Sequence, residues 1–431
     1  MRLLSQLRRR FENVLSEASS KSGNRKHLSV TVATLVASTF LTKTADTLVS
    51  PKITLTALLQ SQGASVQAIS LLVPLRESGA LLPQLWLADL VLRFRRLGPL
   101  YSVGTLIQGF AAMLMMLSAW LLDGVAAGWA IVVCLSVLSI ARALCSISFK
   151  AVLGKTVPAG LRGQTTGWAS SAAGLATVFI SLVLLISPER SGASVLILFL
   201  GLGSVCWWLA SAFFLRIEEE AADRVDGENS TGILKRLVLL RDQKSFRRFV
   251  VVRSLLVSTA LVAPWYVMLS VSSNAALGSV GALLLASGLA SFVSSSLWGR
   301  YSDRSSRWVL QVCAACISAL GVFTVILHVV VPSVFQYLLV VPVLYFVLEV
   351  AHQGVRIARK TYIVDLANDD NRVDYIAISN TLIGVVIVIV GLGTGIVAIW
   401  LSPIGMIAMF SATAAVGALL ASTLPEALEK S

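Results

Sequence analysis

Charged side chains interrupt long apolar stretches of this 431-residue chain, and they are the residues best suited to chemistry. Asp46 and Glu77 place carboxylates in the first two stretches, and Lys43 lies three residues before Asp46, on the same face of a helix. Arg76 precedes Glu77, and Arg142 lies in the fourth stretch. A carboxylate in apolar surroundings with a basic neighbour can bind or release a proton when its access to water changes. These residues predict proton coupling or binding of a charged solute, and permanent structural ion pairs are the alternative.

A second group of candidates lies later in the chain. Glu349 and His352 are three residues apart, and both can titrate between mildly acidic and neutral pH if their surroundings perturb them. Trp265 and Tyr266 follow Pro264, which bends a helix, and their rings can stack on a ligand. Contact with cytoplasmic charges is the alternative for Glu349 and His352, and a position at the membrane interface is the alternative for the two aromatic residues.

The composition indicates which elements position these residues. The chain is 56% hydrophobic and 13% charged, whereas soluble domains contain about 25% charged residues. We therefore predict an all-α membrane protein of twelve transmembrane helices in two pseudo-symmetric six-helix bundles. The predicted spans cover residues 30–58, 66–88, 99–121, 125–148, 164–186, 192–215, 247–271, 277–298, 308–330, 334–357, 374–399 and 403–423. Lys52 and Arg253 lie nearer the ends of their spans, where reaching for the membrane surface would explain them.

Basic residues predict the orientation of the spans. One set of loops, the terminal segments and the central polar segment carry Arg and Lys, whereas the opposite loops hold only Arg190. Because cytoplasmic loops collect basic residues, we expect a multi-pass protein of the bacterial inner (plasma) membrane with both termini in the cytoplasm. The net charge of +13 is explained in the same way, and no nucleic-acid partner is expected.

The chain divides into two similar halves. We expect a cytoplasmic amphipathic segment at 1–27, a first bundle at 28–216, a cytoplasmic linker at 217–246, a second bundle at 247–424 and a cytoplasmic tail at 425–431. Corresponding charges recur in the loops of the two halves: Asp89 and Arg93 recur as Asp303 and Arg307 at an offset of 214, and Lys150 and Arg162 recur as Lys360 and Arg372 at an offset of 210. Two parallel repeats follow from this pattern.

The loop after the eighth predicted span contains a specific motif. Residues 299–307, GRYSDRSSR, fit the pattern G-x-x-x-D-R-x-x-R. This segment resembles the cytoplasmic loop motif of the major facilitator superfamily, and the resemblance covers about residues 28–424. The copy in the first half keeps Asp89 and Arg93 but has Leu85 and Leu90 at the glycine and first arginine positions. The resemblance implies a cytoplasmic gate formed by Gly299, Asp303, Arg304, Arg307, Asp89 and Arg93, which holds one conformation and releases in the other.

The resemblance also implies a function. Arg142 stands where drug–proton antiporters of the superfamily have an arginine, and residues 73–79 and 142–162 look like bacterial permeases without an assigned substrate. We expect a secondary transporter that works by alternating access, is coupled to protons and moves a small polar, charged or amphiphilic organic solute, with export favoured. A lipid or lysolipid transporter and a non-transporting membrane partner or sensor are the alternatives.

Other classes of protein fit the sequence poorly. The chain has no G-x-x-x-x-G-K-[ST] loop for ATP, no H-E-x-x-H motif and only three histidines. We therefore expect no enzymatic activity, no cofactor and no metal site. The expected partners are the solute, protons and membrane lipids, and the expected assembly is a monomer.

Overall fold

The computed structural model describes residues 25–83, 94–186, 192–219, 243–271, 276–366 and 372–426. All regular structure in these ranges is helical. Most of the predicted amphipathic segment at 1–27 and most of the linker lie outside the described residues, as do Asp89 and Arg93 of the predicted gate.

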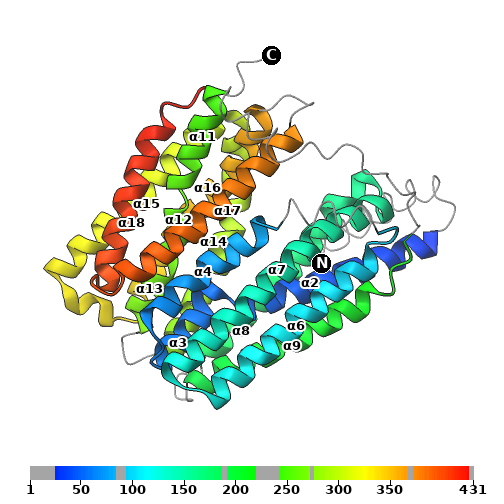
Figure 1. Cartoon of the computed structure of the whole chain (residues 1–431), viewed down its shortest axis with the longest axis horizontal. Coiled ribbons are helices and arrows are strands. Elements are labelled where there is room, and N and C mark those ends of the chain that lie inside the picture. The colour runs from blue at the N-terminus through cyan, green and yellow to red at the C-terminus, as the bar shows by residue number, and fades with distance from the viewer. Residues whose placement is uncertain are drawn as a thin grey trace, which may run out of the picture.

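The helices form two bundles that meet at one end of the molecule and diverge toward the other (Figure 1). The first bundle consists of α2 (Arg25–Leu48), η1 (Pro51–Leu55), α3 (Thr56–Ser61), α4 (Val66–Leu81), α6 (Gly98–Leu121), α7 (Gly124–Thr156), α8 (Ala159–Ile186) and α9 (Gly192–Phe214). The second consists of α11 (Lys244–Leu255), α12 (Ser258–Leu261), α13 (Ala263–Val271), α14 (Ala276–Arg304), α15 (Ser306–Val330), η2 (Pro332–Gln336), α16 (Val340–Leu366), α17 (Arg372–Val397) and α18 (Pro403–Ala421).

Ten helical segments among the described residues are long and apolar enough to cross a membrane. An eleventh is the broken pair Gly278–Ser294 and Leu297–Arg304, whose two parts differ in direction by 42°. The second predicted span corresponds to α4, which has 16 described residues before the chain leaves the described range. The protein is therefore a multi-pass all-α membrane protein, and the count of twelve spans stays a prediction.

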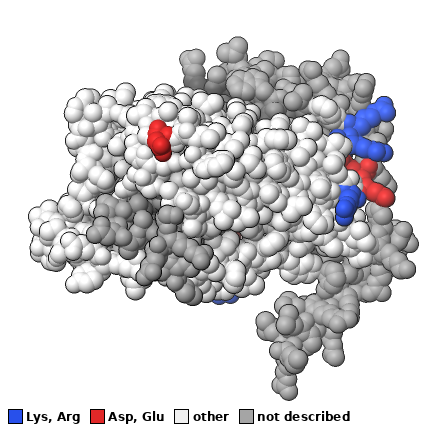
Figure 2. Space-filling view, turned by 90° about the horizontal axis from the view of Figure 1, so that it is seen from below, with Lys and Arg blue, Asp and Glu red and all other residues white. Residues whose placement is uncertain are grey.

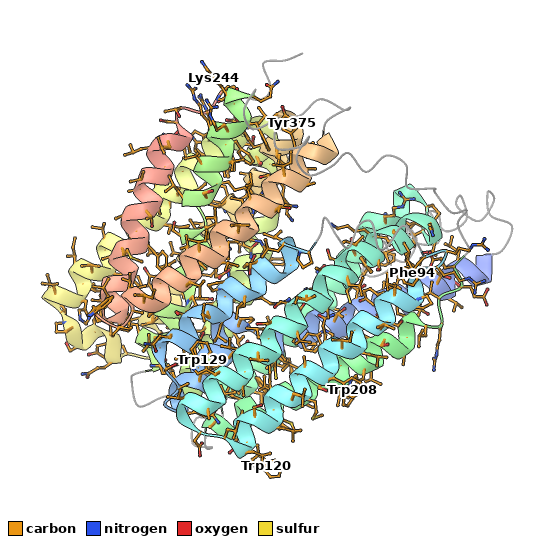
Figure 3. All side chains as sticks on the ribbon, viewed as in Figure 1. Phe94, Trp120, Trp129, Trp208, Lys244 and Tyr375 are labelled. Atoms are coloured by element: carbon orange, nitrogen blue, oxygen red, sulfur yellow. The ribbon has the colours of Figure 1, made fainter. Side chains whose placement is uncertain are left out.

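The outer surface of the bundles matches a lipid environment. One broad face of the molecule has almost no charged side chains except toward its edges (Figure 2). Large apolar side chains such as Phe179 of α8 and Phe292 of α14 are exposed. Trp120 and Trp129 are exposed at one end of the first bundle, whereas Phe94 lies at the opposite end (Figure 3). Exposed tryptophans at a bundle end are typical of a membrane interface.

The two bundles pack through two equivalent pairs of helices. The helix α4 packs against α17, and α8 packs against α14. Because α4 corresponds to α14 and α8 to α17 in the two repeats, a pseudo-twofold axis exchanges the two contacts. Small residues permit the close approach: a side chain at Gly391 would collide with Pro74, and one at Gly281 would lie 2.9 Å from the carbonyl oxygen of Ser181.

The first span of each bundle is broken at a corresponding place. In the first bundle, α2 ends at Leu48 and the chain continues through the π-helical turn η1, which begins at Pro51. In the second bundle, α11 ends at Leu255 and the span continues as α12 and α13. Such breaks redirect side chains inside a membrane span and give it a place to bend. The break in the first bundle places Lys52 in the interior of the protein.

Candidate functional site

A cavity of about 220 Å³ lies within the first bundle between α2, α6 and α7. This volume has room for several water molecules. The lining residues combine charged, polar and aromatic side chains: Thr39, Thr42, Lys43, Asp46, Tyr101, Gln108, Arg142, Cys145, Ser146, Phe149 and Lys150. Asp46 lies near the middle of the 34-residue span Leu28–Ser61.

Asp46 is held by two arginines from different helices. Arg76 Nη2 of α4 donates to Asp46 Oδ1 at 2.8 Å, and Arg142 Nη1 of α7 donates to the same oxygen. The side chain of Asp46 keeps 21% of its surface exposed, and that of Arg142 keeps 33%. One carboxylate oxygen thus joins α2, α4 and α7, and water can still reach the three side chains.

Lys43 does not use Asp46 as its partner. Its Nζ donates to Ser170 Oγ of α8 at 2.7 Å, although the positive charge of Lys43 remains within electrostatic range of Asp46. The lysine therefore connects α2 to α8, the helix that packs against the second bundle.

Glu349 makes an ion pair that joins the two bundles. Its Oε1 lies 3.0 Å from Lys52 Nζ of η1 and accepts a hydrogen bond of 3.2 Å from the hydroxyl of Tyr345. The side chain of Glu349 is 3% exposed, whereas that of Lys52 is 19% exposed. The interpretation of Lys52 as a lysine that reaches for the membrane surface is therefore wrong, because the break at η1 turns it toward α16.

The remaining candidates of the second bundle are buried. His352 lies on α16, the same helix as Glu349. Its Nδ1 lies 3.0 Å from Oγ1 of Thr259 on α12. Trp265 and Tyr266 are 2% and 1% exposed, and the hydroxyl of Tyr266 lies 3.0 Å from Thr324 Oγ1 of α15. Both rings belong to the hydrophobic core that the two bundles share, and neither lines the cavity that contains Asp46.

Glu77 lies among positive charges from both bundles. It forms no ion pair with any described residue, yet Arg356 and Arg359 of α16 act on its charge, as do Lys52 and Arg76. Arg356 is exposed and Arg359 is half-buried. The two arginines are functional candidates that the sequence analysis did not name. Their spacing on one helix face beyond Glu349 and His352 was the available signal.

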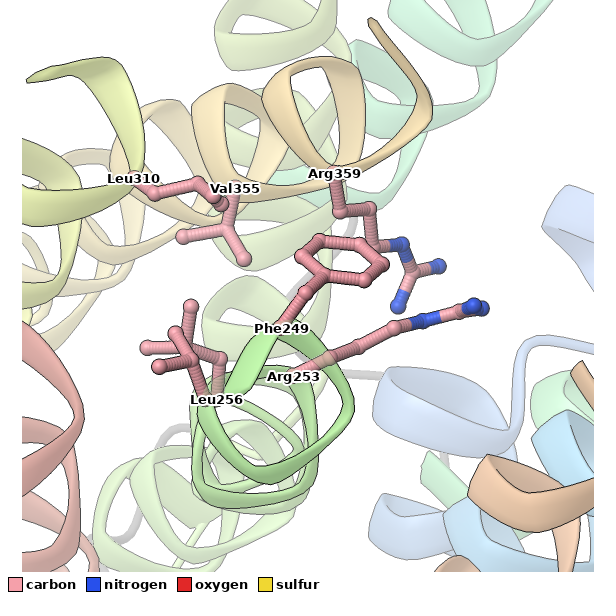
Figure 4. Close-up of a pocket in the computed structure, with 7 residues that line it drawn as sticks. Phe249, Arg253, Leu256, Leu310, Val355 and Arg359 are labelled. Carbon is pink, nitrogen blue, oxygen red and sulfur yellow. The ribbon is translucent and has the colours of Figure 1, made fainter. Parts of the chain in front are cut away.

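Arg253 is a further candidate that the sequence analysis explained in another way. It is 7% exposed and donates through Nη1 to Ser379 Oγ at 2.5 Å and through Nη2 to Asn380 Oδ1 at 2.9 Å, both on α17. Its side chain therefore stays inside the protein and does not extend to the membrane surface. Figure 4 shows the guanidinium groups of Arg253 and Arg359 side by side, both directed past Phe249.

The described residues of the predicted gate, Gly299, Asp303, Arg304 and Arg307, lie at the end of α14 and the start of α15. Arg307 Nε lies 3.0 Å from Glu426 Oε1, and Arg307 Nη1 donates to the carbonyl oxygen of Leu424 at 3.0 Å. Asp303 and Arg304 are exposed, and Gly299 has open space where a side chain would lie. Arg307 thus contacts the end of its own bundle here, and a gating role for the motif stays a prediction.

The first bundle has a contact of the same kind, made by Glu219. Its Oε2 accepts hydrogen bonds from the backbone N–H groups of Leu97 at 2.7 Å and Gly98 at 2.8 Å, and its Oε1 lies 2.8 Å from Lys155 Nζ. Glu219 and Glu426 are 207 residues apart, and each follows the last helix of its bundle. In both bundles a glutamate therefore holds the start of the third span.

Comparisons with known proteins agree with this architecture. No protein-family model and no curated protein matches the chain. Among solved structures, a point mutant of the nucleoside transporter NupG is similar with a TM-score of 0.72 at 14% identity, covering 91% of this chain and 99% of that one. A D-xylose-proton symporter is similar with a TM-score of 0.68 at 14% identity, covering 94% and 99% of the two chains. The inward open conformation of the xylose transporter XylE from E. coli is similar with a TM-score of 0.62 at 15% identity, covering 94% and 98%.

These similarities define the class of fold. The two pseudo-symmetric bundles and the structural neighbours together show the fold of the major facilitator superfamily. At 14–15% identity the similarity concerns the fold.

Proposed function

We propose that this protein is a secondary transporter of a bacterial inner membrane that moves a small solute by alternating access and is coupled to protons. The observation that carries the proposal is Asp46, a partly exposed carboxylate at mid-membrane depth that pairs with Arg76 and Arg142 beside a cavity. Ionisable groups at this depth are costly and serve transport or proton transfer in many membrane proteins. The fold provides the two bundles that alternating access requires.

The conformation fits a state that faces the cytoplasm. At the end of the molecule near Ser61, the bundles are joined by a hydrogen bond of 3.0 Å from Gln60 Nε2 to the carbonyl oxygen of Met268 and by the ion pair of Lys52 and Glu349. At the other end, Lys150 and Lys360 are exposed and lie within electrostatic range of each other. The distribution of basic loops supports a cytoplasmic location of that end and of both termini.

The ion pairs provide a route to coupling. Arg76 lies on α4, which packs against α17, so a rocking motion of one bundle on the other moves Arg76 relative to Asp46. A carboxylate that loses a guanidinium partner in an apolar site is stabilised by binding a proton. Protonation of Asp46 therefore accompanies the change of conformation, and Glu77 and Glu349 are the other carboxylates that can take part.

The proposal is tested with the purified full chain in proteoliposomes that contain a pH-sensitive dye. Solutes are added one at a time under an imposed pH gradient, and proton movement is recorded together with uptake of the labelled solute. We expect at least one solute to move protons, and its direction of movement separates symport from antiport. Absence of both proton and solute movement under every gradient would contradict the proposal and favour a sensor or partner protein.

A further inference from the structure

Three arginines of the second bundle form a positive cluster at the interface with the first bundle. Arg253 lies on α11, and Arg356 and Arg359 lie on α16, one turn apart. Arg359 is within electrostatic range of both other arginines. Among the described residues, none of the three has a carboxylate within ion-pair distance. We refer to Arg253, Arg356 and Arg359 as the arginine cluster.

Arg253, the buried member of the cluster, lacks both an opposite charge and a full set of hydrogen-bond partners among the described residues. Arg253 is more than nine-tenths buried, its two bonded neighbours Ser379 and Asn380 are neutral, and its Nε has no hydrogen-bond partner among the described residues. A buried cation without an opposite charge is costly, and a second guanidinium beside it raises the cost. Basic residues that only mark the cytoplasmic side of a membrane protein lie in loops and do not need such burial.

Basic side chains also outnumber acidic ones among the described residues around the cluster. Nine basic side chains form one electrostatic network: Lys43, Lys52, Arg76, Arg142, Lys150, Arg253, Arg356, Arg359 and Lys360. Among the described residues, Asp46, Glu77 and Glu349 interact with these cations, and the basic groups outnumber them. Asp46 is already paired with two arginines and Glu349 with Lys52. Glu77 is therefore the one described carboxylate in the network that faces the arginine cluster without an ion pair of its own.

We propose that the transported solute is an organic anion whose carboxylate, phosphate or sulfonate group binds Arg356 and Arg359, with Arg253 as the buried positive charge behind them. Guanidinium groups bind such oxyanions through paired, charge-assisted hydrogen bonds. Lys150 and Lys360, which are exposed on the two bundles and within electrostatic range of each other, attract anions from the cytoplasm. Glu77 is the competing carboxylate of the empty site, and the solute displaces it. This inference rests on the proposed transport function and names the class of solute.

Binding is measured on the full chain in detergent at constant ionic strength, without a gradient. The probes are succinate, ribose 5-phosphate and ethanesulfonate, with succinamide and ribose as neutral counterparts and putrescine as a cation. We expect at least one anion to raise the unfolding temperature by about 3 °C or more at saturation, whereas its neutral counterpart and putrescine do not. Equal stabilisation by neutral or cationic probes, or stabilisation by no probe, would overturn the inference.

Variants of the site are expected to change the half-saturating concentration of the anion in opposite directions. Arg356→Gln and Arg359→Gln should each raise the half-saturating concentration of the anion about tenfold or more, because each removes a charged donor. Glu77→Gln should lower it, because the competing carboxylate is gone. Arg216→Gln and Lys244→Gln remove exposed cations outside the cluster and should leave binding unchanged. Unaltered binding in both cluster variants, each folded as judged by a monodisperse gel-filtration peak, would place the anion elsewhere and contradict the inference.

The two proposals fail in different ways. Proton-coupled movement of a neutral solute in proteoliposomes would overturn the organic anion as substrate and leave the transport function standing. Anion binding that depends on Arg359 without any movement of solute or protons would overturn transport and leave an anion-binding membrane protein.

Discussion

Lys52 Nζ of the first bundle lies 3.0 Å from Glu349 Oε1 of the second, so a single ion pair joins residues 297 positions apart in the chain. The pair lies between Asp46 and the end of the first span near Ser61, where the bundles are in contact and which is the non-cytoplasmic side in the proposed orientation. In alternating access this side must open, and the pair must then separate. Lys52 and Glu349 therefore favour the conformation described here over the opposite one.

Loss of this ion pair should change both stability and conformation. Lys52→Met leaves Glu349 buried without its cation, which should cost about 3 kcal/mol in the free energy of unfolding. It should also shift the population toward the outward-facing state, which labelling of an introduced cysteine at Gln60 with a membrane-impermeant reagent would detect. The exchange Lys52→Glu with Glu349→Lys should recover part of the loss. A wild-type unfolding temperature in Lys52→Met would contradict this role.

The packing of α4 against α17 makes a second prediction with a control on the same helix. Gly391→Val should push the two bundles apart, because even the first side-chain carbon collides with Pro74. We expect a cost of about 1–3 kcal/mol in thermal or denaturant unfolding and reduced solute uptake. Gly393→Val is the matched control, because no described atom lies within 4 Å of a side-chain carbon there. Equal effects of the two changes would show that helix propensity, and not the contact, is responsible.

The two glutamates that follow the bundles should differ in importance. The side chain of Glu219 is 2% exposed and holds two backbone N–H groups and Lys155, whereas that of Glu426 is 30% exposed. Glu219→Ala leaves buried donors unsatisfied and should cost about 2 kcal/mol or more. Glu426→Ala should cost less than about 1 kcal/mol. Unfolding temperatures of the two variants measure the difference, and the reverse order would refute it.

Much of the fold could be predicted because a membrane span needs a long apolar run, and such runs are visible in any sequence. The ion pair of Asp46 with Arg142 could also be expected, because opposite charges at similar depth in adjacent apolar spans are stabilised by pairing. The contact of Lys52 with Glu349 could not be predicted, because it depends on the break at η1 and on the packing between bundles. Glu219 was also missed: it lies in an acidic run, and its partners are backbone N–H groups, which leave no pattern in the sequence.

The most direct test of proton coupling measures proton movement and solute exchange independently in the same variant. Asp46→Asn removes the charge that Arg76 and Arg142 share but keeps the size of the side chain, and Asp123→Asn is the control at an exposed position. Proteoliposomes are assayed for solute exchange at equal pH on both sides and for proton movement that accompanies solute uptake. Our account predicts that Asp46→Asn still exchanges solute but no longer moves protons, whereas Asp123→Asn does both. Proton movement at the wild-type ratio in Asp46→Asn would contradict the account.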